Sequence, residues 1–414
     1  MKAKIIFIIA IIFLIFGCKE QKVKKEINLI YMAQSGYQPD VIKNMAIDFE
    51  QKTGTKVNIN FFKYDELYEE IVKSATSTTP IYDVFSLDLI WTAEFAKKNY
   101  CIDLTKNVSD LSSDIAPAIV DAFVYKDKIW AMPFLANFQL FFYNEEYIKQ
   151  AGFTNPPSTL EEMIIQMKAM KTKGILQYPF SDSWNQKEGL VCEYVWLTAG
   201  FGGETFDLNG KPIFNRGAGL KSLEFMVSLL KDGLANPISL NSDESMAKDT
   251  FISGQSAFTS NWTFQYAKMN DPTISKVAGK AKMGLLPVSQ EIIEKYNNTA
   301  SVSGFQGLGI LSNSEYKKES WEYIKFITSK DIQKVHLQEM PIWTSVQNDP
   351  AVRKIDTVMD IKSKQIASVH HRPKVVKYTE ISAIMQRYIH LALEGSMKPK
   401  DALDKAVEEI DTLQ

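Results

Sequence analysis

The chain has 414 residues, a hydrophobic content of 45%, a charged content of 23% and a formal net charge of −2. This composition is that of a globular protein of two or three domains that can build a substantial core. No clustered basic segment is present, so the sequence gives no support for nucleic-acid binding.

The first segment, 1–17, has the features of a bacterial export signal. Two lysines supply a positive start, an apolar run extends over 5–16, and Gly17 directly precedes Cys18. The run is shorter than the roughly 20 apolar residues of a membrane-spanning helix. The residues Ile-Phe-Gly-Cys resemble the lipobox of bacterial lipoproteins, although Phe16 is bulkier than the small residue usual there. We therefore predict a cleaved signal with acyl chains on Cys18, and an uncleaved anchor is the alternative.

Segment 18–26 is charged and contains one apolar residue. Such a segment cannot bury enough surface to order itself, so it is predicted to be a lipid anchor and tether. A basic patch for lipid headgroups is the weaker interpretation, because Glu20 and Glu26 interrupt it. We expect the protein to be attached to a membrane outside the cytoplasm, on either the periplasmic or the extracellular face.

The folded body begins with alternating strand-like and helix-like segments. Apolar alternation and helical periodicity predict three strands and three helices in turn: strands over 26–32, 56–62 and 81–86, and helices over 40–52, 64–76 and 89–99. This order predicts parallel pairing through right-handed crossovers, and therefore an α/β sheet.

The pattern changes in the long β-like stretch 128–144, which contains Pro133. Proline is poorly tolerated in a central strand, so we expect the chain to leave one sheet here and enter another. The Gly-rich segment 301–311 and the pair Met340-Pro341 are candidates for two further crossings.

The remaining segments are mostly helical, and no internal repeat or low-complexity segment follows the tether. Helices are expected over 159–173, 189–199, 217–232, 244–253, 321–327, 378–393 and 399–413, with short strands over 256–260 and 283–287.

Three cysteines and four histidines give no metal-binding pattern. There is no CxxC pair, no HExxH pattern and no Cys/His cluster at zinc spacing, so no metal or cofactor is expected. Apart from Cys18, the cysteines are Cys101 and Cys192, far apart in the sequence. A disulfide is possible in an exported protein, but two buried free thiols are the favoured interpretation.

Five stretches occur together in a recognisable order, and they cover nearly the whole body of the chain: 130–144 with 151–153 and 156–162; 202–204 with 233–237; 251–262; 303–310 with 321–326; and Arg372-Pro373 with Tyr378 and the terminal helices. In this order they resemble the family 1 extracellular solute-binding proteins of bacterial ABC importers, the group of maltose-, trehalose- and multiple-sugar-binding proteins.

This resemblance implies a two-lobed periplasmic-binding-protein fold of the α/β class, with three crossing segments between the lobes. The N-terminal lobe would comprise 27–133 plus 304–341, and the C-terminal lobe 134–303 plus 342–414. The ligand would bind in the cleft between them, and the lobes would close around it by a hinge motion.

The function implied is that of a non-enzymatic, lipid-anchored protein, expected to be a monomer. It would capture a sugar or oligosaccharide and deliver it to the permease subunits of an ABC importer. A polyol, glycerol phosphate or polyamine is the alternative solute. An exported glycosidase, which needs two carboxyl groups roughly 5–10 Å apart, and a surface adhesin are the alternatives of another class.

A sugar site needs polar groups for hydroxyl edges and aromatic planes for CH-lined faces. Some candidates follow the carboxyl ends of predicted parallel strands, where ligands of α/β sheets bind, and the others come from the resemblance. The candidate ligand-binding residues are Gln34, Ser35, Tyr37, Asp88, Trp91, Asn137, Asn261, Trp262, Phe305, Gln306 and Arg372.

Four of these candidates have a specific structural alternative. Trp262 could be a core residue, and Asp88 could cap a helix. Asn137 could be a hydrogen-bonded hinge residue, and Arg372 could form a structural ion pair.

Overall fold

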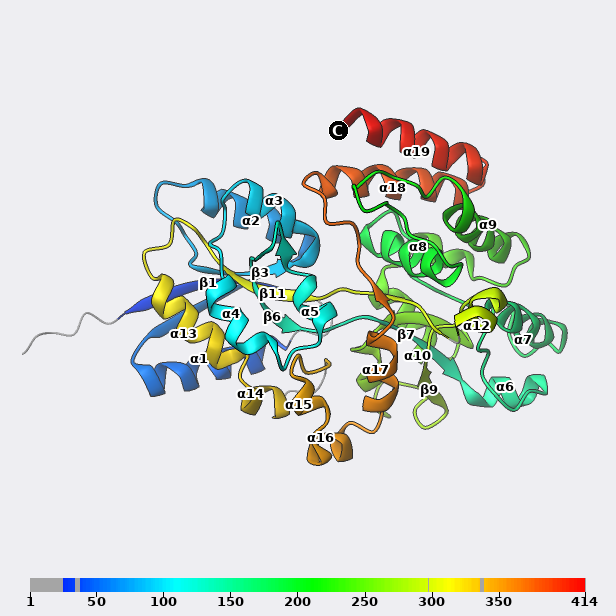
Figure 1. Cartoon of the computed structure of the whole chain (residues 1–414). Helices are drawn as coiled ribbons and strands as arrows, with labels where there is room; N and C mark the ends of the chain where they lie inside the picture. The colour runs from blue at the N-terminus through cyan, green and yellow to red at the C-terminus, as the bar shows by residue number, and fades with distance from the viewer. Residues whose placement is uncertain (1–24, 34–37, 297, 336–338, 414) are drawn as a thin grey trace, which may run out of the picture.

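The structure is a computed structural model that describes residues 25–33, 38–296, 298–335 and 339–413. Two lobes lie side by side, as Figure 1 shows, with extended segments running between them. The first lobe contains the N-terminal part of the described chain, and the second carries the two C-terminal helices. The predicted two-lobed α/β fold is therefore present.

The first lobe is built on a five-stranded sheet with the strand order β2-β1-β3-β11-β6. Its strands are β1 (Glu26–Met32), β2 (Lys56–Phe62), β3 (Val84–Asp88), β6 (Met132–Leu135) and β11 (Gln306–Ile310). β1 pairs in parallel with β2 and β3, as the strand-helix alternation predicted. β11 runs antiparallel to both β3 and β6 and comes from a distant part of the sequence.

Helices cover this sheet, and a small hairpin of β4 (Val124–Tyr125) and β5 (Lys128–Ile129) adjoins it. The helices are α1 (Pro39–Thr53), α2 (Tyr64–Thr76), η1 (Leu89–Trp91), α3 (Thr92–Lys97), α4 (Thr105–Ser112), α5 (Pro117–Asp121), α13 (Lys317–Ile327) and α14 (Lys330–Val335). Helix α1 shows why they form: proline opens it, Gly54 closes it in the left-handed conformation at φ 75°, and one apolar face is buried.

The second lobe has a three-stranded antiparallel sheet with the order β8-β7-β9. Its strands are β7 (Gln139–Asn144), β8 (Phe258–Trp262) and β9 (Ala281–Gly284), with a separate pair β10 (Ser301–Val302) and β12 (Val369–His370).

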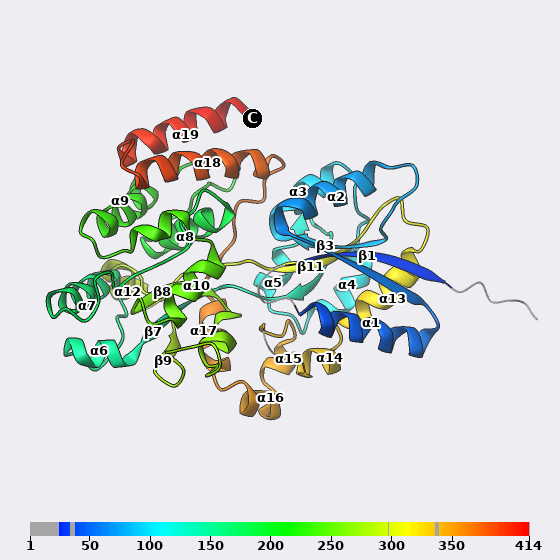
Figure 2. The same ribbon diagram turned by 180° about the vertical axis from the view of Figure 1, so that it is seen from behind.

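Helices surround the sheet of this lobe as well. They are α6 (Glu145–Ala151), α7 (Leu160–Thr172), α8 (Glu188–Gly200), α9 (Gly217–Lys231), η2 (Pro237–Asn241), α10 (Glu244–Ile252), α11 (Gln265–Met269), α12 (Gln290–Tyr296), α17 (Met359–Ile366), α18 (Tyr378–Leu393) and α19 (Pro399–Leu413). Seen from behind in Figure 2, α8 and α10 lie on the side of the lobe that faces the first lobe.

The chain passes between the lobes at neighbouring places. It leaves β6 and enters β7 through residues 136–138, and it returns from β10 to β11 through residues 303–305. Bridges join Phe138 to Ser303 and Ala136 to Met340, so three segments that are distant in sequence lie side by side. Pro133 lies inside β6 and does not end it, because β6 is an edge strand and proline is tolerated there.

The third passage comes later than the predicted boundary at residue 341. Helix α15 (Thr344–Gln347) is held to the first lobe, because the Trp343 indole donates to the Thr328 carbonyl at 2.7 Å and Ser345 bonds Asp114. The sequence division placed this helix in the other lobe. After α16 (Pro350–Ile355), the chain reaches the second lobe at α17 and β12.

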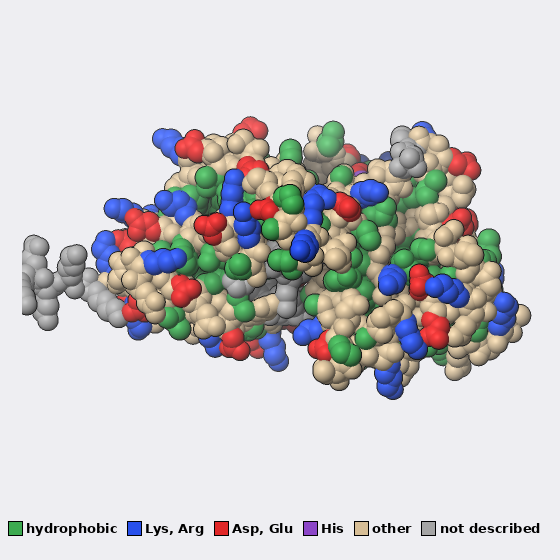
Figure 3. All heavy atoms as spheres, turned by 90° about the horizontal axis from the view of Figure 1, so that it is seen from below, with side chains coloured by type: hydrophobic (Ala, Val, Ile, Leu, Met, Phe, Trp, Pro, Cys, Tyr) green, Lys and Arg blue, Asp and Glu red, His purple; other side chains and the backbone are tan. Residues whose placement is uncertain are grey.

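Cys101 and Cys192 are both free and buried, as favoured from the sequence. Within the part of the chain that the structure describes, no helix combines the length and apolarity needed to cross a bilayer. Acidic and basic side chains are interspersed over the face seen from below in Figure 3.

Candidate functional site

A cavity of about 360 Å³ lies between the lobes and is lined by both of them. The first lobe contributes the start of α2, the end of β3 and the start of β11. The second contributes the first turns of α8 and α10 and the end of β8. Of the residues predicted from the sequence, the structure brings together around this cavity Asp88, Asn137, Trp262, Gln306 and Arg372.

One wall of the cavity is aromatic and tightly packed. Trp262 ends β8, and its side chain is 8% exposed. A Cβ atom on Gly304 would lie 2.8 Å from the indole and 3.2 Å from Asn137 Oδ1. The backbone of residues 303–305, the second crossing segment, therefore packs against both the ring and the amide. A side chain at position 304 would collide with them, so this position requires glycine.

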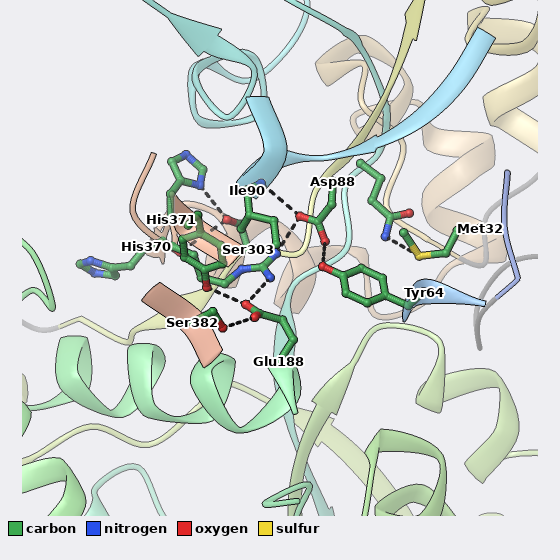
Figure 4. A network of polar contacts seen from close by, with 12 residues as sticks. Met32, Tyr64, Asp88, Ile90, Glu188, Ser303, His370, His371 and Ser382 are labelled. Carbon is green, nitrogen blue, oxygen red and sulfur yellow. Dashed lines mark hydrogen bonds and ion pairs between the residues drawn. The ribbon is translucent and has the colours of Figure 1, made fainter. Parts of the chain in front are cut away.

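A charged network crosses from one lobe to the other beside this wall (Figure 4). Arg372 donates from Nη2 to Asp88 at 2.9 Å and from Nη1 to Glu188 at 2.8 Å. Tyr64 donates to the other Asp88 oxygen at 3.0 Å, and Tyr378 donates to Glu188 at 2.6 Å. One guanidinium thus links a carboxylate at the end of β3 to a carboxylate at the start of α8.

The protonation states in the network follow from its surroundings. Burial opposes the charge on Arg372, but the carboxylates of Asp88 and Glu188 outweigh it and raise the pKa of the guanidinium. Burial and the same carboxylates raise the pKa of Tyr64 well above its ordinary value. The arginine therefore stays charged, and the phenol stays a hydrogen-bond donor.

At three positions the structural alternatives raised by the sequence are present. Trp262 belongs to the buried core of the second lobe, and the other two positions are Asp88 and Arg372. The Asp88 carboxylate accepts from the Ile90 backbone N–H at 3.3 Å and caps η1. Arg372 forms the ion pairs described above. Both residues also line the cavity, so a structural role and a place at the site occur together.

Three predicted residues do not line the cavity. Trp91, 2% exposed, stacks on Tyr64 with ring centroids 5.5 Å apart. Asn261 donates to the Glu244 carbonyl at 2.9 Å and accepts from the Trp262 N–H at 2.8 Å. Phe305 is fully buried. Trp91 and Asn261 therefore support lining residues from behind, and Phe305 belongs to the core.

The other predictions fall outside the described residues. Gln34, Ser35 and Tyr37 belong to a segment that is not described, although Ala33, directly before it, lines the cavity. The proposed lipid-bearing residue Cys18 is also outside the described part of the chain.

Sequence reasoning missed several charged lining residues. They lie mostly at or beside helix starts, and they include Lys63, Asp65, Lys187, Glu188, Asp243 and Glu244. Acidic residues are common in the first turn of any helix, because they complement its dipole. The positions of the acidic members therefore carried no signal that separated a binding role from an ordinary role at a helix start.

Two of the lining carboxyl groups are electrostatically strained. Burial and the neighbouring carboxylates of Asp243 and Glu188 raise the pKa of Glu244, although the Trp262 indole donates a hydrogen bond to it. Burial raises the pKa of Glu339 to about 8, and the Thr263 hydroxyl donates to it. Both groups therefore keep their protons to a higher pH than an exposed carboxyl group does.

Two α/β lobes with a polar and aromatic cavity between them define the class of two-lobed solute-binding proteins. The chain belongs to the bacterial extracellular solute-binding protein family, whose model matches residues 44–357. It is thus a solute-binding protein of the ABC-transporter type, with a small-molecule ligand and a permease as its partners. Proteins of this class bind substrates for transport and are not enzymes.

Curated relatives agree with this assignment. The chain is 25% identical over 389 residues to the "Probable ABC transporter-binding protein" of Deinococcus radiodurans, covering 88% of each chain. It is 26% identical over 313 residues to a "Probable amino-acid ABC transporter periplasmic-binding protein" of Sinorhizobium fredii, covering 73% of this chain and 68% of the relative.

Solved structures show the same fold. Maltose-bound MalE3 of T. maritima has a TM-score of 0.84 and 26% identity, over 94% of this chain and 100% of that one. A solute-binding protein of Agrobacterium radiobacter in complex with ribitol has a TM-score of 0.83 and 24% identity, over 94% and 99%.

Proposed function

We propose that the interlobe cavity captures a sugar, an oligosaccharide or a related polyol, and that the protein delivers it to the permease of an ABC importer. The observation that carries the proposal is the wall formed by Trp262, Asn137 and Gly304, which sets an aromatic plane beside polar groups. Sugars present CH-lined faces to such rings and hydroxyl edges to such polar groups.

Unsatisfied polar atoms support the same ligand class. The amide oxygens Asn137 Oδ1 and Gln306 Oε1 are buried, and no residue in the described part of the chain donates a hydrogen bond to them. Buried acceptors are costly unless they are paired, and hydroxyl groups are suitable donors. The maltose and ribitol complexes of structurally similar proteins support a hydroxyl-rich solute.

A thermal-shift screen of the purified protein against mono- and oligosaccharides and polyols tests this proposal. Ligand that binds only the native state raises the unfolding midpoint in proportion to RT ln(1 + [L]/Kd). Replacing Trp262 by Ala is expected to weaken binding by about tenfold, since ring packing contributes about 1–1.5 kcal/mol. Trp262→Phe retains an aromatic plane and should retain most of the shift.

The absence of a shift with every sugar and polyol would contradict the proposal. Release of product from any oligosaccharide in the same samples would instead support the glycosidase alternative.

The lipid anchor is a separate part of the proposal, supported by the lipobox-like residues before Cys18. In cells, Cys18→Ser is expected to move the protein from the membrane fraction to the soluble fraction, because acyl chains anchor it by their buried methylene groups. Cys101→Ser, which changes a buried thiol of the first lobe, should leave the protein in the membrane fraction.

A further inference from the structure

The lining of the cavity is unequal in charge. Its cationic residues are Lys63, Lys187 and Arg372. Its acidic residues are Asp65, Asp88, Glu188, Asp243, Glu244 and Glu339. Carboxylates therefore outnumber cations around a space that is enclosed by both lobes.

The cations are largely committed to part of this acidic set. Arg372 is held by Asp88 and Glu188, and Lys187 lies 3.1 Å from Asp65. Within the described part of the chain, no Lys, Arg or His forms an ion pair with the remaining three acidic residues, which are Asp243, Glu244 and Glu339. These three carboxyl groups thus lack an internal cation, and a cationic ligand would favour their charged forms.

This surplus of acidic residues is concentrated where α8 and α10 begin. Gly189 directly follows Glu188 in the first turn of α8. A Cβ atom on Gly189 would lie 2.8 Å from the Glu244 carboxylate, so that carboxylate packs against this turn. Asp243 precedes it in sequence and caps α10. Mutual repulsion and burial make the charged form of Glu244 unfavourable in the empty cavity.

A second observation, independent of the acidic residues, concerns a buried hydrogen-bond acceptor beside the cavity. Gln306 lines the cavity and is 4% exposed. Its amide nitrogen donates to Met32 Sδ at 3.2 Å, whereas none of the described residues donates a hydrogen bond to its oxygen. A buried carbonyl oxygen of this kind accepts from a ligand that brings N–H or O–H groups.

We infer that the transported solute carries at least one protonated amine together with its hydroxyl groups, as in an amino sugar or an oligosaccharide with free amines. The inference rests on the proposed function and narrows its ligand class. An ammonium group has three donors and no acceptor, which matches a site with unpaired acceptors and with carboxyl groups whose charged form a bound cation would favour. The Trp262 ring, which lines the same space, also favours a cation over its face.

Matched ligand pairs test the inference by calorimetry on the purified protein in near-neutral buffer. Glucosamine is compared with glucose, and chitobiose, which has free amines, with cellobiose and with its N-acetylated form. We expect the amine-bearing member of each pair to bind at least about tenfold more tightly. Acetylation should remove the advantage, since it removes the charge.

Variants locate the effect. Glu244→Gln and Glu339→Gln are each expected to lower the ratio of amine to neutral affinity by about tenfold. Glu66→Gln makes the same change of net charge at an exposed position of α2 that does not line the cavity, and should leave the ratio unchanged.

Equal or tighter binding of the neutral members would overturn the inference and leave the proposed function intact. Binding of putrescine as tight as that of chitobiose in the same calorimetric assay would also overturn it, because hydroxyl groups would then be unnecessary. No binding by any sugar or polyol, charged or neutral, would overturn the inference and the proposed function together.

Discussion

At the level of single residues, Glu193 and Asp182 form a buried acidic pair in the second lobe. The Ser260 hydroxyl lies 2.7 Å from Glu193 Oε2 and also contacts an oxygen of Asp182. A hydroxyl has one proton and can donate to only one of them, so the other contact needs a carboxyl proton. Burial raises the pKa of Asp182 and raises that of Glu193 to about 7.

This pair predicts a pH-dependent stability. A carboxyl group whose pKa is higher in the folded than in the unfolded protein favours folding only while it holds its proton. The contribution of this pair to stability is therefore complete below the usual Glu value of 4.5 and is lost as pH rises toward about 7. Urea unfolding across this range should show a smaller decline in Glu193→Gln than in the parent, and the remaining decline comes from other raised groups such as Glu339.

A surface variant provides the control for this pH series. Glu224→Gln, at an exposed position of α9, should retain the slope of the parent. A Glu193→Gln variant with the same slope as the parent would show that the pair does not hold the proton.

Some of the cavity-lining residues could be predicted from their local sequence, and others could not. Asp88 ends β3, a strand that pairs in parallel with β1, and that position alone favours a site. Trp262, which ends β8, and Gln306, which begins β11, lie on antiparallel strands and were predicted from the family resemblance. Glu188 and Glu244 begin helices, where acidic residues are common for local reasons, so only the three-dimensional structure separates them. The commitment of Arg372 to two carboxylates could not be predicted, because its partners come from different lobes.

At the level of the elements, the glycines of the second crossing and β11 have distinct roles. A Cβ atom on Gly304 would meet the Trp262 ring at 2.8 Å, whereas one on Gly309 would meet the Phe85 ring at 2.4 Å. Gly304→Ala should displace the indole and weaken ligand binding by about tenfold with little loss of stability.

Gly309→Ala is the matched comparison. It overfills the core of the first lobe, which usually costs about 1–3 kcal/mol, and should lower the urea midpoint while binding persists. Equal effects of both substitutions on binding and stability would contradict this separation.

The elements themselves were largely predictable from periodicity. The strands over 26–32 and 56–62 and the helix over 64–76 have the predicted bounds, because an apolar pattern and polar ends fix them locally. The prediction of a strand over 81–86 was displaced, since the strand begins at Val84. The crossing attributed to Pro133 occurs after Leu135, because pairing with β11 places that proline at a sheet edge.

At the level of the whole molecule, two ion pairs connect the lobes across the cavity, and they differ in burial. The side chains of Arg372 and Asp88 are 2% and 5% exposed, whereas those of Lys187 and Asp65 are 59% and 73% exposed. Removing one partner of a buried pair leaves an unpaired buried charge and typically costs about 3–5 kcal/mol. An exposed pair contributes about 0–1 kcal/mol.

We therefore expect Arg372→Met to open the lobes. The variant leaves the Asp88 and Glu188 carboxylates buried without their shared cation, and separation of the lobes is the simplest way to return both to water. Small-angle X-ray scattering should show a larger radius of gyration, and the urea midpoint should fall. Lys187→Ala removes the exposed pair and should change neither quantity measurably. A parent-like radius and midpoint for Arg372→Met would show that closure depends on other connections between the lobes, such as the crossing segments and the Lys374–Asp121 ion pair, and not on Arg372.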